Sequence, residues 1–301
     1  MNKIIFAAAL LVAAGAIAGD AASGVRLTAA DKPFVPAVVP KSQSVAQLRV
    51  LPRKLMPFVR ATLDGKECNL LFDTGATHTT FDVGFMRREL PKTKLEGVML
   101  AGTTNVEGVP KIFHAHSLKI GEAEFGEFEA MALDIAHFVP GIGVKVDGIV
   151  GMNVIGSVPT LLSLGSGKVV FAPEPKECVG FGKGIDRLAD EPFTVAMSPS
   201  FEGKRFAMIV DSASSLTLLS KSLGWPSSKK SVDIEAVEVN GSSALSMDAG
   251  LVGKLILGTE VEISPMLTGD LTGRIGADTL IAYDMLVDLA CVRFRRRATS
   301  R

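Results

Sequence analysis

The sequence predicts an all-β protein with two related lobes, and two pairs of matching segments lead to this prediction. An apolar run leads into Asp73-Thr74-Gly75-Ala76, and a second apolar run leads into Asp211-Ser212-Ala213-Ser214. Further along each half, an apolar residue is followed by a glycine, at Val150-Gly151 and at Ile275-Gly276. Each half is therefore expected to contain a strand, a turn at an aspartate, a long β-rich stretch and an apolar-glycine segment.

The residues before the two aspartates also match. Asp64-Gly65-Lys66 precedes Asp73 by the same six-residue interval that separates Glu202-Gly203-Lys204 from Asp211. A repeat without a gap indicates an internal duplication whose unit is built around an aspartate.

Residues 1–18 are expected to be a signal peptide. Lys3 precedes an apolar and small-residue run, and Ala16-Ile17-Ala18 gives the small-x-small pattern of a cleavage site. The run is shorter than the ~20 residues that cross a bilayer, so it favours export over an uncleaved membrane anchor and predicts no stable membrane insertion. We expect a periplasmic or extracellular protein in which the proline-containing residues 19–52 form an exposed linker.

The first lobe is assigned to residues 53–174. It is expected to begin with two strands joined by a hairpin turn at Asp64-Gly65, the second of which leads into Asp73. A short helix capped by Asp82 follows, and a hairpin over residues 161–171 closes the lobe.

The second half is divided in the same way. Residues 175–190, which are rich in glycine, are expected to link the lobes, residues 191–297 to form the second lobe, and residues 298–301 to form a tail. The polar stretches Gly102–Gly108 and Asn240–Ser243 are flap candidates that would fold over an extended peptide.

The order of these motifs resembles the retropepsin-like aspartic proteases, over roughly residues 53–297. Asp73-Thr74-Gly75-Ala76 matches the family's Asp-Thr-Gly-Ala turn, and Val150-Gly151 matches the segment that crosses beneath the active site. In the second half Asp211-Ser212 and Ile275-Gly276 match, whereas Ala213 departs from the pattern. The resemblance implies an acid-protease fold, in which two related β-barrel-like lobes have a cleft between them.

The resemblance also implies a role for each residue of the two turns. Asp73 and Asp211 would form a catalytic dyad that holds one proton between two facing carboxylates and activates a water molecule. The hydroxyls of Thr74 and Ser212 would form hydrogen bonds to the opposite lobe and keep the loops rigid. Gly75 would keep side-chain atoms away from the substrate backbone.

The expected function is that of an aspartic endopeptidase that acts on an extended polypeptide and needs no cofactor. Because the second lobe is already fused, we expect a monomer rather than a dimer that pairs two copies of Asp73. The alternative function is a catalytically inactive, peptide-binding relative, with Ala213 marking the loss of activity; a methyl group there would strain a left-handed turn or narrow the floor of the cleft.

Charge and composition restrict the other functions. The formal net charge is zero, so no basic surface predicts a nucleic-acid partner. His114 and His116 share one face of an expected strand, but no carboxylate or cysteine completes a ligand spacing in the sequence, and no metal site is expected. Three cysteines allow at most one disulfide within the chain, for which Cys178 and Cys291 are the preferred pair.

Overall fold

The computed structural model consists of β-structure with a few short helices, which confirms the all-β class. It describes residues 37–39, 43–52, 54–97, 111–135, 143–181, 185–186, 196–201, 204–205, 207–215, 218–219, 231–233, 236–239, 254–256, 271–287 and 291–297. The expected signal peptide and both flap candidates lie outside these residues. Among the described residues, no helix is long and apolar enough to cross a bilayer.

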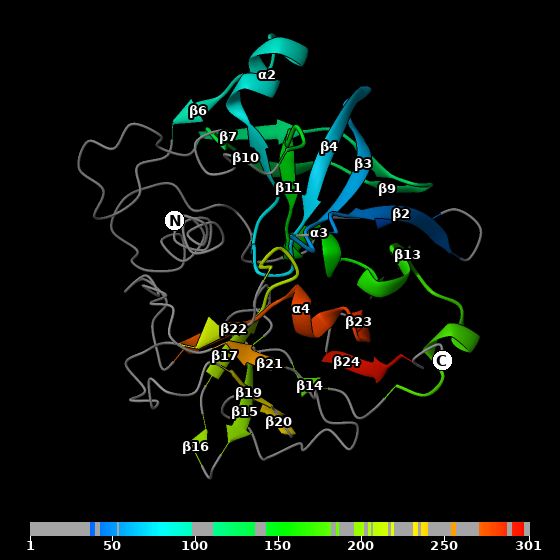
Figure 1. Ribbon diagram of the computed structural model, residues 1–301. Helices are drawn as coiled ribbons and strands as arrows, with labels where there is room; N and C mark the ends of the chain where they lie inside the picture. The colour runs from blue at the N-terminus through cyan, green and yellow to red at the C-terminus, as the bar shows by residue number, and fades with distance from the viewer. Residues whose placement is uncertain are drawn as a thin grey trace.

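The described strands form two sheets, of sixteen and eight strands, and over these residues neither sheet closes into a barrel. In Figure 1 most strands of the first half, coloured blue to green, lie above those of the second half. The elements of the first half are β1 Ala37–Val38, β2 Ser44–Val50, β3 Pro57–Leu63, β4 Lys66–Phe72, β5 Thr80–Asp82, α2 Val83–Glu89, β6 Glu96–Gly97, β7 Lys111–Ala115, β8 Leu118–Ile120, β9 Ala123–Phe125, β10 Phe128–Leu133, β11 Gly148–Val150, α3 Met152–Ile155, β12 Thr160–Ser163, η1 Leu164–Ser166, β13 Lys168–Phe171 and η2 Pro175–Cys178.

Most strands of the second half form the smaller sheet, and the others join the larger sheet. Its elements are β14 Ile185–Asp186, β15 Ala196–Phe201, β16 Lys204–Arg205, β17 Ala207–Val210, β18 Leu218–Leu219, β19 Ser231–Asp233, β20 Ala236–Val239, β21 Lys254–Ile256, β22 Leu271–Ile275, α4 Ala277–Leu280, β23 Tyr283–Val287 and β24 Cys291–Arg296.

The local turn signals of the first half are confirmed. β3 and β4 form an antiparallel hairpin whose turn residues, Asp64 and Gly65, have φ angles of 45° and 81°. Positive φ at both positions is the geometry of the tight hairpin turns that Asp-Gly favours. Asp82 caps α2, because its Oδ1 accepts a hydrogen bond of 2.9 Å from the N–H of Phe85.

The expected linker differs from the structure at its C-terminal end. Residues 44–50, which the sequence analysis places in an exposed linker, form β2 and pair with both β13 and β3. Their side chains alternate between buried and exposed, as in a strand with one face on the core. Pro33, Pro36 and Pro40 all precede this strand and do not interrupt its alternation.

Strands from the two halves meet in the larger sheet. β23 pairs antiparallel with β12 on one side and with β24 on the other, so the end of the chain continues the sheet of the first half. The apolar core is also continuous, because residues such as Phe72 and Phe171 belong to the same buried cluster as Tyr283 and Phe294.

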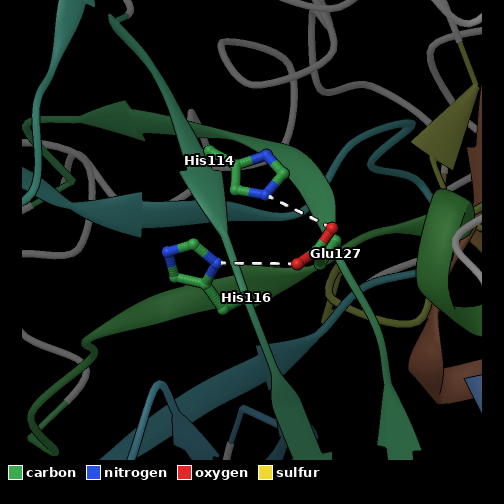
Figure 2. Close-up of side chains that lie close together, drawn as sticks. All are labelled: His114, His116 and Glu127. Carbon is green, nitrogen blue, oxygen red and sulfur yellow. Dashed lines mark ion pairs between the residues drawn. The ribbon is translucent and has the colours of Figure 1, made fainter.

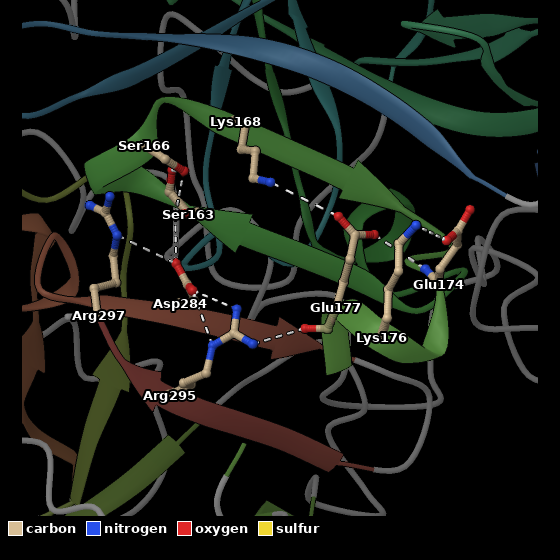
Figure 3. Close-up of polar contacts among 9 residues, drawn as sticks. All are labelled: Ser163, Ser166, Lys168, Glu174, Lys176, Glu177, Asp284, Arg295 and Arg297. Atoms are coloured by element: carbon tan, nitrogen blue, oxygen red, sulfur yellow. Dashed lines mark hydrogen bonds and ion pairs between the residues drawn. The ribbon is translucent and has the colours of Figure 1, made fainter. Parts of the chain in front are cut away.

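Polar contacts strengthen this junction between the halves (Figure 3). Ser163 on β12 donates a hydrogen bond of 2.6 Å to Asp284 Oδ1 on β23. Arg295 on β24 pairs with Asp284 Oδ2 at 2.7 Å and donates to the carbonyl oxygens of Glu177 and Val179. These contacts hold β12, β23, β24 and η2 in one position relative to one another.

The cysteines do not form the expected bridge. Cys178 is a free thiol, as is the buried Cys68, so the structure does not contain a Cys178–Cys291 disulfide.

Candidate active site

Each aspartate follows a strand that is held by a parallel neighbour. β4 pairs with β11, and the N–H of Asp73 donates a hydrogen bond of 3.0 Å to the carbonyl oxygen of Val150. In the second half β17 pairs in parallel with β22, and the N–H of Asp211 donates to the carbonyl oxygen of Ile275 at 2.9 Å. The two apolar-glycine segments found in the sequence are thus the strands that anchor the two aspartate turns.

The turns themselves have the same hydrogen-bond pattern. Asp73 Oδ1 accepts from the N–H groups of Gly75 and Ala76 at 2.8 and 3.2 Å. Asp211 Oδ1 accepts from the N–H groups of Ala213 and Ser214 at 3.0 and 2.8 Å. Two backbone donors on one oxygen fix the orientation of each carboxyl group relative to its own turn.

Hydroxyl groups lock the two turns to each other. The N–H of Thr74 donates to Ser212 Oγ at 3.0 Å, and the N–H of Ser212 donates to Thr74 Oγ1 at 3.0 Å. The Thr74 hydroxyl donates to the Val210 carbonyl at 2.9 Å, and the Ser212 hydroxyl donates to the Phe72 carbonyl at 2.7 Å. These four buried hydrogen bonds cross between the halves and relate them by an approximate twofold symmetry.

The carboxyl groups of Asp73 and Asp211 interact with each other and are buried. Asp73 is 4% exposed and Asp211 is 0% exposed. The pKa of Asp73 is raised well above its ordinary value, first by burial, then by the negative charge of Asp211, and also by a hydrogen bond with the Asp211 side chain. The backbone donors of Gly75 and Ala76 act in the opposite direction. Such a pair favours one shared proton.

Ala213 fits its turn without backbone strain. Its φ is outside the left-handed region, as is that of Gly75 at the corresponding position, so the expected strain of a methyl group in such a turn does not occur. Gly75 is required for a different reason. A Cβ atom there would lie 2.8 Å from Asp211 Cγ, which is closer than non-bonded carbons approach.

A polar support behind the first turn was missed by the sequence analysis. The Asn153 side-chain oxygen accepts from both the N–H and the hydroxyl of Thr79 at 2.9 Å, and Thr79 Oγ1 accepts from the N–H of Gly151 at 3.1 Å. These contacts tie the segment after Asp73 to α3. The signal was present as a polar Asn153 within an otherwise apolar stretch, since a buried amide needs partners.

Two of the histidines, His114 and His116, lie far from both aspartate turns in the sequence. His114 and His116 are exposed and gather with Glu127, and this is the group that could hold a metal ion among the described residues. His78 follows the first turn and is partly buried, and burial lowers its pKa to about 4. His137 is outside the described residues.

Comparison with known families agrees with this geometry. The model of an aspartyl protease family matches residues 59–154, a segment that includes Asp73, its turn and the anchoring strand β11. A search of curated proteins gives no significant match to the chain. Over residues 59–154 the chain is therefore similar to the aspartyl protease family.

Proposed function

We propose that the protein is an aspartic endopeptidase in which Asp73 and Asp211 together activate a water molecule. The observation that carries the proposal is the symmetrical pair of buried aspartate turns, joined by the four hydrogen bonds of Thr74 and Ser212. A rigid pair of facing carboxyl groups with a raised pKa on one side is the arrangement that can serve as acid and base at once.

The reaction would use the shared proton of the pair. The ionised carboxylate takes a proton from water while the resulting hydroxide attacks the carbonyl carbon of the peptide bond. The protonated carboxyl group donates its proton to the carbonyl oxygen, which gives a neutral tetrahedral intermediate. In the collapse of that intermediate, the carboxyl group that took a proton from water gives it to the peptide nitrogen, and the other carboxylate takes a proton from one of the two hydroxyl groups. The carbon–nitrogen bond then breaks, which leaves an amine, a carboxylic acid and one proton on the aspartate pair. The raised pKa of Asp73 favours keeping one proton on the pair.

The substrate that suits this site is an extended polypeptide, which can add to the edge of a β-sheet through its main chain. We further propose that the protein acts as an exported monomer, in line with the apolar run over residues 4–18 and the presence of both aspartate turns in one chain.

The test is cleavage of an unstructured protein from about pH 3 to about pH 8, with Asp73→Asn and Asp211→Asn beside the wild type. We expect each substitution to reduce kcat by about 100-fold or more, because general acid-base catalysis contributes at least this much. Glu67→Gln is the matched control, since Glu67 is an exposed carboxylate on β4, the strand that leads into Asp73. Full activity of Asp211→Asn would instead indicate a dimer that pairs two copies of Asp73.

The second candidate is a catalytically inactive, peptide-binding relative, for which Ala213 is the specific observation. A folded wild type that cleaves nothing but binds an extended peptide, with affinity unchanged by Asp73→Asn, would establish this function in place of the first.

A further inference from the structure

Two histidines and a glutamate meet on an exposed face of the first half (Figure 2). His114 lies on β7, His116 directly follows it, and Glu127 directly precedes β10. Glu127 Oε2 is 3.9 Å from His114 Nε2, and Glu127 Oε1 is 3.9 Å from His116 Nδ1. One nitrogen of each ring and one carboxylate oxygen all lie within 4.8 Å of one another.

The sheet fixes the backbone beneath these side chains. β7 and β10 pair antiparallel, with Ala115 opposite Phe128, and this register places His116 beside Glu127 at the end of the pair. Asp64 Oδ1 accepts hydrogen bonds from the N–H groups of His116 and Ser117, at 2.9 and 2.8 Å. The strand end that carries the histidines is therefore anchored to the β3–β4 turn, and only side-chain rotations remain free.

We propose that His114, His116 and Glu127 bind a divalent transition-metal ion, with Zn²⁺ the best match to their chemistry. Two imidazole nitrogens and one carboxylate oxygen form a donor set that zinc accepts, with water in the remaining position, whereas Ca²⁺ and Mg²⁺ prefer oxygen ligands alone. Metal–ligand bonds of about 2.1 Å place the ligand atoms of a tetrahedral site about 3.4 Å apart. The three ligand atoms now lie within 4.8 Å of one another, so the longest separation needs to shorten by no more than about 1.4 Å.

The side chains can make that adjustment. Their exposed fractions are 51% for His114, 70% for His116 and 72% for Glu127, so neighbouring atoms leave room for rotation about χ1 and χ2. The two imidazole rings are already close, with centroids 4.9 Å apart in an edge-to-face arrangement. Glu129 lies directly opposite His114 across the two strands and adds a second negative charge beside the site.

Metal binding would close a loop in the chain. His116 and Glu127 flank residues 117–126, which contain β8 and β9, so an ion held by both would join the two ends of this hairpin. An ion that binds the folded state more tightly than the unfolded state stabilises the folded state. The ligands include neither residues of the Asp73 turn nor residues of the Asp211 turn, so metal binding can be tested separately from peptide cleavage.

The experiment is a calorimetric titration of tag-free, EDTA-treated protein with ZnCl₂, for the wild type and for His114→Ala, His116→Ala and Glu127→Gln. We expect one zinc ion per chain for the wild type and at least about tenfold weaker binding for each variant, because each loses one of three ligands. At free zinc about 100 times the Kd, the wild-type Tm should rise by roughly 5 °C and that of the variants much less.

Glu122→Gln is the matched control, since it removes an exposed carboxylate from the turn between β8 and β9 without touching the three ligands. Its zinc affinity should equal that of the wild type. Circular dichroism would establish that every variant is folded, as expected for exposed positions. Zinc binding that survives Glu127→Gln and both histidine substitutions, or a folded wild type that binds no zinc at stoichiometric concentration, would overturn the proposal.

Discussion

Replacing Gly75 by alanine should disable the aspartate pair by direct contact. A Cβ atom at position 75 would lie 2.8 Å from Asp211 Cγ and 3.1 Å from Asp211 Oδ1. Ordinary carbon contacts are about 3.5–4.0 Å, so the carboxyl group of Asp211 or the turn around Gly75 must move by roughly 0.7 Å or more. Both are held by the buried hydrogen bonds of their turns, which leaves no direction of easy movement.

The size of the effect follows from that displacement. Misplacing a catalytic group by about 1 Å can reduce the rate about 100-fold, which corresponds to about 2.7 kcal/mol in the activation barrier. Overpacking of a buried site also lowers the free energy of unfolding, by roughly 1–3 kcal/mol. We therefore expect Gly75→Ala to reduce kcat about 100-fold and to lower the Tm by several degrees.

The assay is steady-state cleavage of an unstructured protein, together with thermal unfolding of the same preparations. Ala213→Gly is the reciprocal variant, because it removes a methyl group from the corresponding position of the second turn. It should keep the aspartate pair and lose about 1 kcal/mol of stability through reduced burial and greater freedom of the unfolded chain. A Gly75→Ala protein with the kcat and Tm of the wild type would refute the close contact between Gly75 and Asp211.

Three further predictions concern stability and reactivity. His78 is partly buried, and burial lowers its pKa from 6.5 to about 4, so the native state takes up a proton less readily than the unfolded state. The free energy of unfolding should therefore be highest above about pH 6.5 and should fall by up to about 3 kcal/mol as the pH drops toward 4. His78→Gln should make the free energy of unfolding less dependent on pH, as measured by urea unfolding at a series of pH values. An equal dependence on pH in the wild type and the variant would refute this role of His78. Burial is the main reason why the pKa of the Cys68 thiol is raised to about 12, so this thiol should react with iodoacetamide only after unfolding. Cys178, which is less buried, should react in the native protein. Mass spectrometry of the peptides would measure both reactions. Asp284→Ala should lower the free energy of unfolding by about 2 kcal/mol, because Ser163 and Arg295 lose their carboxylate partner at a largely buried junction. The exposed Lys94–Glu96 pair is the control, and Glu96→Ala should leave the unfolding midpoint unchanged.

Local signals allowed much of the first half to be predicted from sequence. The hairpin turn at Asp64-Gly65 and the helix cap at Asp82 depend on residues a few positions apart, and both occur as expected. The apolar-glycine segments were identified from their repetition in the two halves of the sequence, but their parallel pairing with the strands before Asp73 and Asp211 is a property of the folded chain.

Long-range contacts set the limit of that prediction. Nothing in the residues around β23 indicates that it will pair with β12, more than a hundred positions earlier, because both are short apolar strands that could pair elsewhere. Glu127 was not grouped with the two histidines for the same reason, since the β8–β9 hairpin separates it from His116 in sequence and returns it in space.

The departure at Ala213 has a physical effect that the sequence pattern alone does not convey. Its methyl group is 3% exposed and belongs to an apolar cluster with Ala76, Leu71 and Ile149 of the first half. Apolar groups packed around the turns exclude water from Asp73, and burial is the first cause of its raised pKa. The methyl group at position 213 is thus accommodated in this apolar cluster, whereas a methyl group at position 75 would collide with Asp211. Ala213 is thus compatible with the geometry of the pair, and the cleavage assay decides between the two candidate functions.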